Sequence, residues 1–164
     1  MSRSLLALVA AALVAVGCAS KKPNNNPDSL AGSNGDNTGL SLELKGDSDS
    51  GTAGGLQTVY FGFDSSSLDG SSRDSAQANA DFLKANASVE VQIEGHCDER
   101  GGIQYNLALG ERRAKAVRDF IVASGVSAKR VNIISYGKEK PVAFGHEEAA
   151  WGKNCLANFV VTAT

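Results

Sequence analysis

The chain has 164 residues, with 16 lysines and arginines against 18 aspartates and glutamates, and a formal net charge of −2. This length allows one ordinary domain with additional tail segments and leaves little room for a second domain. The near-neutral charge gives no broad basic surface for phosphates, and no motif of the common nucleic-acid-binding domains is present, so we do not expect nucleic acid as a partner.

The N-terminus has the features of a secretory signal. Arg3 supplies a positive charge, residues 5–16 are all apolar, and Gly17 precedes Cys18. The apolar run is shorter than the ~20 residues that a membrane-spanning helix needs. It is followed by small residues and a cysteine instead of a basic flank, which indicates a signal peptide and not a transmembrane helix.

Cys18 explains why the number of cysteines is odd. Small residues before a cysteine resemble the lipobox of bacterial lipoproteins, in which the thiol is lipidated and the signal is cut just before it. We therefore expect a lipoprotein signal peptide at 1–17 and a lipid anchor on Cys18, which several acyl chains would hold stably in the membrane. The same resemblance implies export to the outer membrane, because Ala19 is not an aspartate. The alternative is an ordinary signal peptide and an incidental cysteine.

Residues 18–56 are predicted to be a flexible linker that begins at the lipidated Cys18. The segment is rich in Ser, Gly, Asn and Asp, as in the stretches PNNNPDS and KGDSDSGTAGG. Such a composition cannot bury enough apolar surface to fold by itself. The linker would let a lipid-anchored domain reach partners away from the membrane.

Residues 57–164 are predicted to form one domain. The hydrophobic patterns predict strands at 58–63, 89–94, 130–135 and 156–162, helices at about 71–86 and from the polar loop 96–102 to 124, and an irregular stretch around Pro141. The first helix has an apolar stripe formed by Ala76, Ala80, Leu83 and Ala87. The order β-α-β-α-β-β predicts an α/β (α+β) two-layer sandwich, in which two helices cover one face of a mixed sheet.

Arg113 interrupts the apolar face of the second helix. It lies nearly in line with Asn106, and Gly110 between them leaves a notch for a small polar group. A buried guanidinium costs several kcal/mol unless it is paired, so Arg113 needs an anion from the chain or from a ligand. Asp98, just after the second strand, is the expected partner.

Two interpretations of Asp98 and Arg113 follow from these residues alone. The first is an internal ion pair that fixes the loop. The second is a clamp for a zwitterion, in which Asp98 binds an ammonium group and Arg113 binds a carboxylate through two hydrogen bonds. Asn106 could serve either group.

The sequence resembles the outer membrane protein A-like (OmpA-like) peptidoglycan-binding domain. The resemblance covers nearly all of 57–164. The lipobox and linker of this chain also fit the lipid-anchored members of that family. The stretches that carry it are YFGFD at 60–64, IEGHCDERGGIQYNLALGERRAKAV at 93–117, ISYGKEKP at 134–141 and GHEEAAWGKN at 145–154.

The resemblance implies the ligand and its site. In that family, the residues that match Asp98 and Arg113 bind the meso-diaminopimelate of the peptidoglycan stem peptide, a zwitterion. Asn106 and Asp64 match further residues of the same pocket. The resemblance implies a ligand contact less directly for four neighbouring positions in the loop and helix, Glu99, Arg100, Tyr105 and Leu109.

The chain departs from the family at two cysteines. The family commonly has Asn-Arg-Arg where this chain reads Asn154-Cys155-Leu156, so any ligand contact of either arginine is missing, and it usually has alanine or threonine at Cys97. In the family's sheet the strands before Cys97 and after Cys155 are adjacent and antiparallel. We therefore expect a Cys97–Cys155 disulfide in the oxidising periplasm.

The alternative to a binding protein is a periplasmic cell-wall enzyme, such as a peptidoglycan hydrolase or a metal-dependent amidase. His96 and Cys97 are neighbours near a strand and would point to opposite faces, which disfavours a Cys-His dyad. A zinc site at His96, Cys97 and Cys155 would lack the paired spacing of zinc ligands. We expect no catalytic residues, no metal and no cofactor.

The resemblance also implies cellular partners. The family tethers the outer membrane to the cell wall without a covalent bond, and it contacts TolB and other Tol proteins of the Tol-Pal system during cell division. We therefore expect an outer-membrane lipoprotein whose domain faces the periplasm and binds the peptidoglycan stem peptide.

Overall fold

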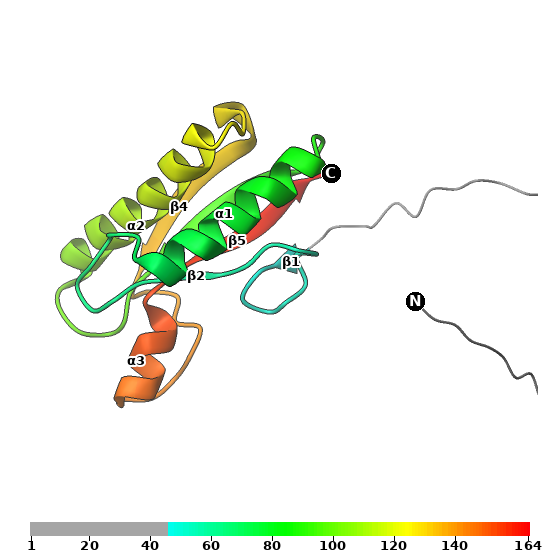
Figure 1. The fold of residues 1–164 in the computed structure, drawn as a ribbon. Coiled ribbons are helices and arrows are strands. Elements are labelled where there is room, and N and C mark those ends of the chain that lie inside the picture. Colours follow the sequence, from blue (N-terminus) through cyan, green and yellow to red (C-terminus); the bar gives the residue numbers. More distant parts are fainter. Residues whose placement is uncertain (1–45) are drawn as a thin grey trace, which may run out of the picture. The chain divides into compact units, whose positions relative to one another are not determined.

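The computed structural model describes residues 46–164 (Figure 1). The expected signal peptide at 1–17, Cys18 and the expected linker as far as residue 45 lie outside the described residues. None of the described helices is long and apolar enough to cross a membrane.

Within residues 46–164, five strands form one mixed sheet: β1 (Gly46–Asp47), β2 (Val59–Tyr60), β3 (Glu90–His96), β4 (Val131–Gly137) and β5 (Leu156–Ala163). The order is β1-β5-β3-β4, and β2 also pairs with β5. β3 is parallel to β4 and antiparallel to β5. Since β3 occupies one edge of β5, β1 and β2 share the other edge, β1 beside Val160 and Val161 and β2 beside Leu156 and Ala157.

Helices α1 (Gly70–Ala85) and α2 (Ile103–Ala123) cover one face of the sheet (Figure 1). α2 connects β3 to β4, which is the crossover that two parallel strands require. Ala76, Ala80 and Leu83 of α1 are buried in the core. Ala87 is exposed, because α1 ends before it. The predicted two-layer fold with a mixed sheet is confirmed.

Residues 46–56 pack on the domain, where the sequence predicts linker. Ala53 and Leu56 are buried in the main core. The polar residues form a compact turn: Asp47 Oδ1 accepts from the Ser50 amide at 2.8 Å, and Ser48 Oγ donates to Asn158 Oδ1 at 2.9 Å. The Ser, Gly and Asp content of this stretch therefore reflects turn geometry, and residues 46–56 belong to the folded region.

A third helix, α3 (Glu148–Asn154), lies in the stretch that the sequence predicts to be irregular. It is short and contains Gly152, so its pattern carries no helical periodicity. Asn154 holds the preceding loop, because its Oδ1 accepts from the amides of Val142 and Ala143 at 2.8 and 3.0 Å. α3 projects beyond the end of the sheet that carries the β3–α2 loop (Figure 1).

β3 and α2 touch backbone to backbone at Gly95 and Gly110. A Cβ atom on Gly95 would lie 1.9 Å from the Gly110 carbonyl oxygen, so no other residue fits at this position without displacing the helix. This contact fixes the first half of α2 against the end of β3. The side chains that follow β3 and those of the first turns of α2 therefore meet in one place.

Candidate functional site

A cavity of about 170 Å³ opens where β3, the β2–α1 loop, α2 and the start of β5 meet. Seven of the eight ligand residues expected from the sequence line it, and only Glu99 does not. Phe63 and Gly101 line it as well, although the sequence did not single them out. The full lining consists of Phe63, Asp64, Cys97, Asp98, Arg100, Gly101, Tyr105, Asn106, Leu109, Arg113 and Cys155.

Asp98 is buried, and both of its carboxylate oxygens accept hydrogen bonds. Oδ1 accepts from the Arg100 amide at 2.9 Å and from Arg100 Nε at 3.1 Å. Oδ2 accepts from Arg100 Nη2 at 2.6 Å and from Cys155 Sγ at 3.4 Å. Burial raises the pKa of Asp98, but the hydrogen bonds from Arg100 outweigh it and leave the pKa below its ordinary value. The site therefore holds a carboxylate anion.

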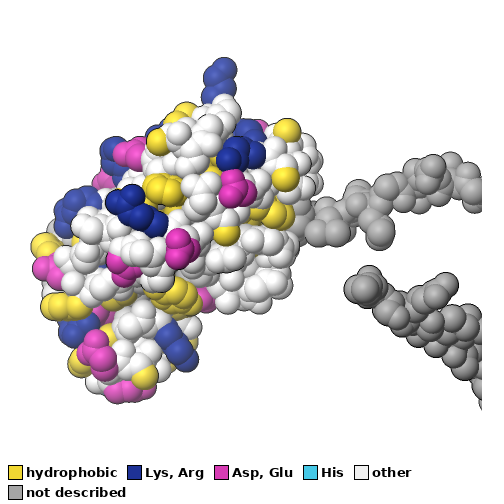
Figure 2. Space-filling view, viewed as in Figure 1, with side chains coloured by type: hydrophobic (Ala, Val, Ile, Leu, Met, Phe, Trp, Pro, Cys, Tyr) yellow, Lys and Arg dark blue, Asp and Glu magenta, His cyan; other side chains and the backbone are white. Residues whose placement is uncertain are grey.

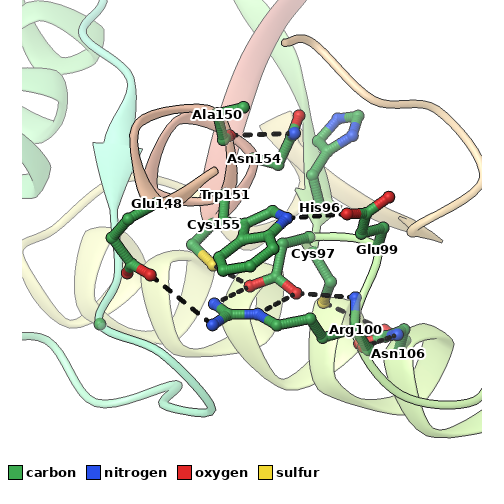
Figure 3. Close-up of polar contacts among 12 residues, drawn as sticks. His96, Cys97, Glu99, Arg100, Asn106, Glu148, Ala150, Trp151, Asn154 and Cys155 are labelled. Atoms are coloured by element: carbon green, nitrogen blue, oxygen red, sulfur yellow. Dashed lines mark hydrogen bonds and ion pairs between the residues drawn. The ribbon is translucent and has the colours of Figure 1, made fainter. Parts of the chain in front are cut away.

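Arg100 lies between two aromatic rings. Its guanidinium carbon is 4.0 Å from the Phe63 ring centre and 4.2 Å from the Trp151 ring centre. Its Nη1 is 3.7 Å from Glu148 Oε2. Figure 3 shows the guanidinium under the Trp151 ring, with Glu148 approaching from the side opposite Glu99. α3 thus contributes two of the groups that hold Arg100.

Arg113 is completely buried, as its position on the apolar face of α2 predicts. Its guanidinium donates to three backbone carbonyls, those of Ser65 at 2.8 Å, His96 at 2.8 Å and Gly62 at 3.0 Å. Among residues 46–164, no carboxylate forms an ion pair with it. The expected Asp98–Arg113 ion pair is therefore not formed, because Arg100 takes Asp98 and loop carbonyls take Arg113.

Asn106 and the pair Asp64–Tyr105 shape the rest of the cavity. Asn106 is buried, and its Nδ2 donates to the Arg100 carbonyl at 2.7 Å, which holds the β3–α2 loop. The Tyr105 hydroxyl donates to Asp64, and this hydrogen bond raises the pKa of Tyr105. Asp64 has a φ of 51°, an unusual backbone conformation for a residue other than glycine. Such strain is typical of functional sites.

Cys97 and Cys155 are buried free thiols, so the structure does not contain the expected disulfide. Antiparallel pairing of β3 with β5 ends at Gly95 and Ala157, two residues short of both cysteines. Each thiol has its own acceptor: Cys97 Sγ donates to the Asn106 carbonyl at 3.3 Å, and Cys155 Sγ donates to Asp98. Burial raises the pKa of Cys97 to about 11.

Glu99 faces a second cavity of about 200 Å³ beside the first, lined in part by His146 and Trp151. Its carboxylate accepts from Trp151 Nε1 at 2.9 Å and contacts His146 Nδ1 at 2.7 Å (Figure 3). The hydrogen bond with His146 lowers the pKa of Glu99 and raises the pKa of His146. Glu99 therefore supports Trp151, which in turn covers Arg100.

Acidic and basic side chains alternate over the face seen in Figure 2, with no field of one sign. Within residues 46–164, no group of three His, Cys, Asp or Glu side chains could hold a metal ion. The described cavity combines two carboxylates, Asp64 and Asp98, with two guanidinium groups and an apolar wall, an arrangement that suits a small zwitterion.

Comparisons with known proteins identify the family of the chain. The sequence profile described as the OmpA family matches residues 60–154. A "Peptidoglycan-associated lipoprotein" of Pasteurella multocida (strain Pm70) is 50% identical over 97 residues, which are 59% of this chain and 65% of that relative. A protein of the same description from Pseudomonas aeruginosa is 41% identical over 152 residues, 90% of each chain.

A solved structure shows the same similarity in three dimensions. The crystal structure of the peptidoglycan-associated lipoprotein from Burkholderia pseudomallei has a TM-score of 0.62 and 44% sequence identity, and the match covers 64% of this chain and 89% of that one. Both the sequence and the fold therefore lead to one assignment. The chain belongs to the OmpA family and, within it, to the peptidoglycan-associated lipoproteins.

Proposed function

We propose that this chain is an outer-membrane lipoprotein that binds peptidoglycan noncovalently and so tethers the outer membrane to the cell wall. The observation that carries the proposal is the cavity that combines the carboxylate of Asp98 with the buried guanidinium of Arg113, which has no carboxylate partner among the described residues. The stem peptide of peptidoglycan offers matching groups in meso-diaminopimelate, an ammonium beside a carboxylate. Asp98 would accept from the ammonium.

Arg113 would act mainly through its charge and its hold on the loops. Its N–H groups bind the carbonyls of Gly62, Ser65 and His96, which fixes the walls of the cavity. Its positive charge is not neutralised by a described carboxylate, so it favours an anionic ligand group in the adjacent space. Asp64, Tyr105, Asn106 and Leu109 would complete the binding surface.

Cys18 would carry the lipid anchor, and the residues that follow would link it to the domain in the periplasm. TolB and the other Tol proteins are proposed partners because the family implies them. We propose that the chain is not an enzyme. The described cavity offers no activated nucleophile, since burial raises the pKa of the Cys97 thiol to about 11 and disfavours the thiolate.

Sedimentation of the mature chain with purified sacculi tests the proposal. We expect the wild-type chain to pellet with sacculi and Asp98→Asn to lose at least tenfold in affinity. Asp119→Asn, which changes an exposed carboxylate on α2, is the matched control and should bind as the wild type does. If Asp98→Asn binds sacculi as strongly as the wild type does, the proposed binding site is wrong. Release of soluble muropeptides would instead support the alternative of a cell-wall enzyme.

A further inference from the structure

Asp98 has no free acceptor position for a ligand in this structure. Three hydrogen bonds from Arg100 and one from Cys155 occupy its two oxygens. The Asp98 side chain is only 5% exposed, so solvent cannot substitute for these bonds. The Cys155 thiol is a weak donor, so the strong hydrogen bonds all come from Arg100, and an ammonium group that pairs fully with Asp98 displaces the guanidinium of Arg100.

Arg100 can leave Asp98 without leaving the site. The rings of Phe63 and Trp151 hold its guanidinium from both faces, which permits movement within the plane between them. Glu148 Oε2 already lies 3.7 Å from Nη1, the guanidinium nitrogen that makes no hydrogen bond to Asp98. The Glu148 side chain is 79% exposed, so it offers only a weak, solvent-screened ion pair.

We propose that Arg100 is a selectivity residue that makes binding an exchange of ion pairs. In the free protein it neutralises Asp98. When a zwitterion binds, the ligand's ammonium takes Asp98, and the released guanidinium pairs with the ligand's carboxylate. The inference rests on the proposed function and deepens it, because it gives the cavity a means of distinguishing a zwitterion from a simple cation.

The exchange distinguishes zwitterions from amines by charge balance. A zwitterion replaces one buried ion pair with two, so every charge stays paired. An amine without a carboxylate takes Asp98 but leaves Arg100 with Glu148 alone, and the loss of a charge-assisted, bidentate pair opposes its binding. The site should therefore select ligands that carry both groups.

Calorimetric titration of the mature chain with meso-diaminopimelate and with cadaverine, the diamine that lacks both carboxylates, tests the exchange. We expect the wild-type chain to prefer meso-diaminopimelate and Arg100→Gln to reduce the ratio of the two affinities at least tenfold, mainly because cadaverine binds more tightly. Arg100→Lys should restore part of the ratio. Arg73→Gln, an exposed arginine on α1 outside the cavity, is the matched control and should leave the ratio unchanged.

A second readout follows Arg100 itself. The Nε–H resonance of Arg100, which donates to Asp98 in the free protein, should shift when meso-diaminopimelate is added to the wild-type chain. If Arg100→Gln has the same affinity ratio as the wild type, or loses affinity for both ligands equally, the exchange is overturned. The proposed function still stands in that case, provided that the wild-type chain binds sacculi. If the wild type binds neither sacculi nor meso-diaminopimelate, both the proposed function and the exchange fail.

Discussion

Gly95 of β3 lies against Gly110 of α2 with no space for a side chain between them. A Cβ on Gly95 would lie 1.9 Å from the Gly110 oxygen, which is backbone and cannot rotate away. We predict that Gly95→Ala lowers the free energy of unfolding by about 3 kcal/mol, measured by urea denaturation. Gly152→Ala is the control, since nothing lies within 4 Å of its added Cβ. Equal midpoints for the two variants would contradict the close contact.

Arg113 should contribute to stability independently of any ligand. Arg113→Met leaves the buried carbonyl of His96 and the partly buried carbonyls of Gly62 and Ser65 without their donors. We expect the free energy of unfolding to fall by roughly 4 kcal/mol. Arg112→Met, the adjacent and exposed arginine, should change it by less than about 0.5 kcal/mol. A small effect of Arg113→Met in urea denaturation would show that the carbonyls find other donors.

The folded region should extend before residue 57. Leu56 is 7% exposed and belongs to the main core, so Leu56→Ala should lower the free energy of unfolding by about 3 kcal/mol. Asp49→Ala, at an exposed position of the same turn, should change it little. If both substitutions leave the thermal midpoint unaltered, residues 46–56 behave as the linker that the sequence predicts.

The contact between Glu99 and His146 should depend on pH. Because the pKa of His146 is raised in the folded state, its contribution to stability is fully present below pH 6.5. This contribution is lost as the pH rises through the pKa of His146 in the folded protein. Because the pKa of Glu99 is lowered in the folded state, its contribution to stability is fully present above pH 4.5. This contribution is lost as the pH falls through the pKa of Glu99 in the folded protein. In the Glu99→Gln variant, we expect the pKa of His146, measured by NMR titration, to return toward 6.5. No change would show that the pair does not form in solution.

Thiol titration should detect both cysteines of the domain as free. The native protein should react slowly, because burial raises the pKa of Cys97 to about 11 and also raises the pKa of Cys155. In denaturant without reductant, two thiols per mature chain should react at once. If none reacts until a reductant is added, Cys97 and Cys155 form the disulfide that the family resemblance implies.

The sequence predicts the two-layer fold because its long helices and central strands have strong hydrophobic periodicity. It does not predict β1 or α3, since a two-residue strand and a seven-residue helix are too short for a pattern to emerge. Turn-forming Ser, Gly and Asp residues have the same composition as a disordered linker. Boundaries drawn from composition therefore exclude residues 46–56.

The sequence predicts most of the residues that line the cavity, but it does not predict which of them pair with one another. The inward position of Arg113 follows from helical periodicity, and its burial is confirmed. Its partners are backbone carbonyls, which no side-chain pattern reveals. Asp98 instead pairs with Arg100, two residues later, in a loop whose conformation is fixed by Asn106. Local loop geometry, and not sequence spacing, decides which arginine reaches the carboxylate.

The position of β1 has a mechanical consequence. The chain enters β1 at Gly46 beside Val161, whereas the cavity lies at the other end of β5, near Cys155. Tension between these two ends would pull β1 along β5 and load the β1–β5 pairs, Gly46 with Val161 and Asp47 with Val160, sideways to their N–H···O bonds. The bonds would then share the force in shear instead of opening one by one, a geometry suited to a protein pulled from both ends.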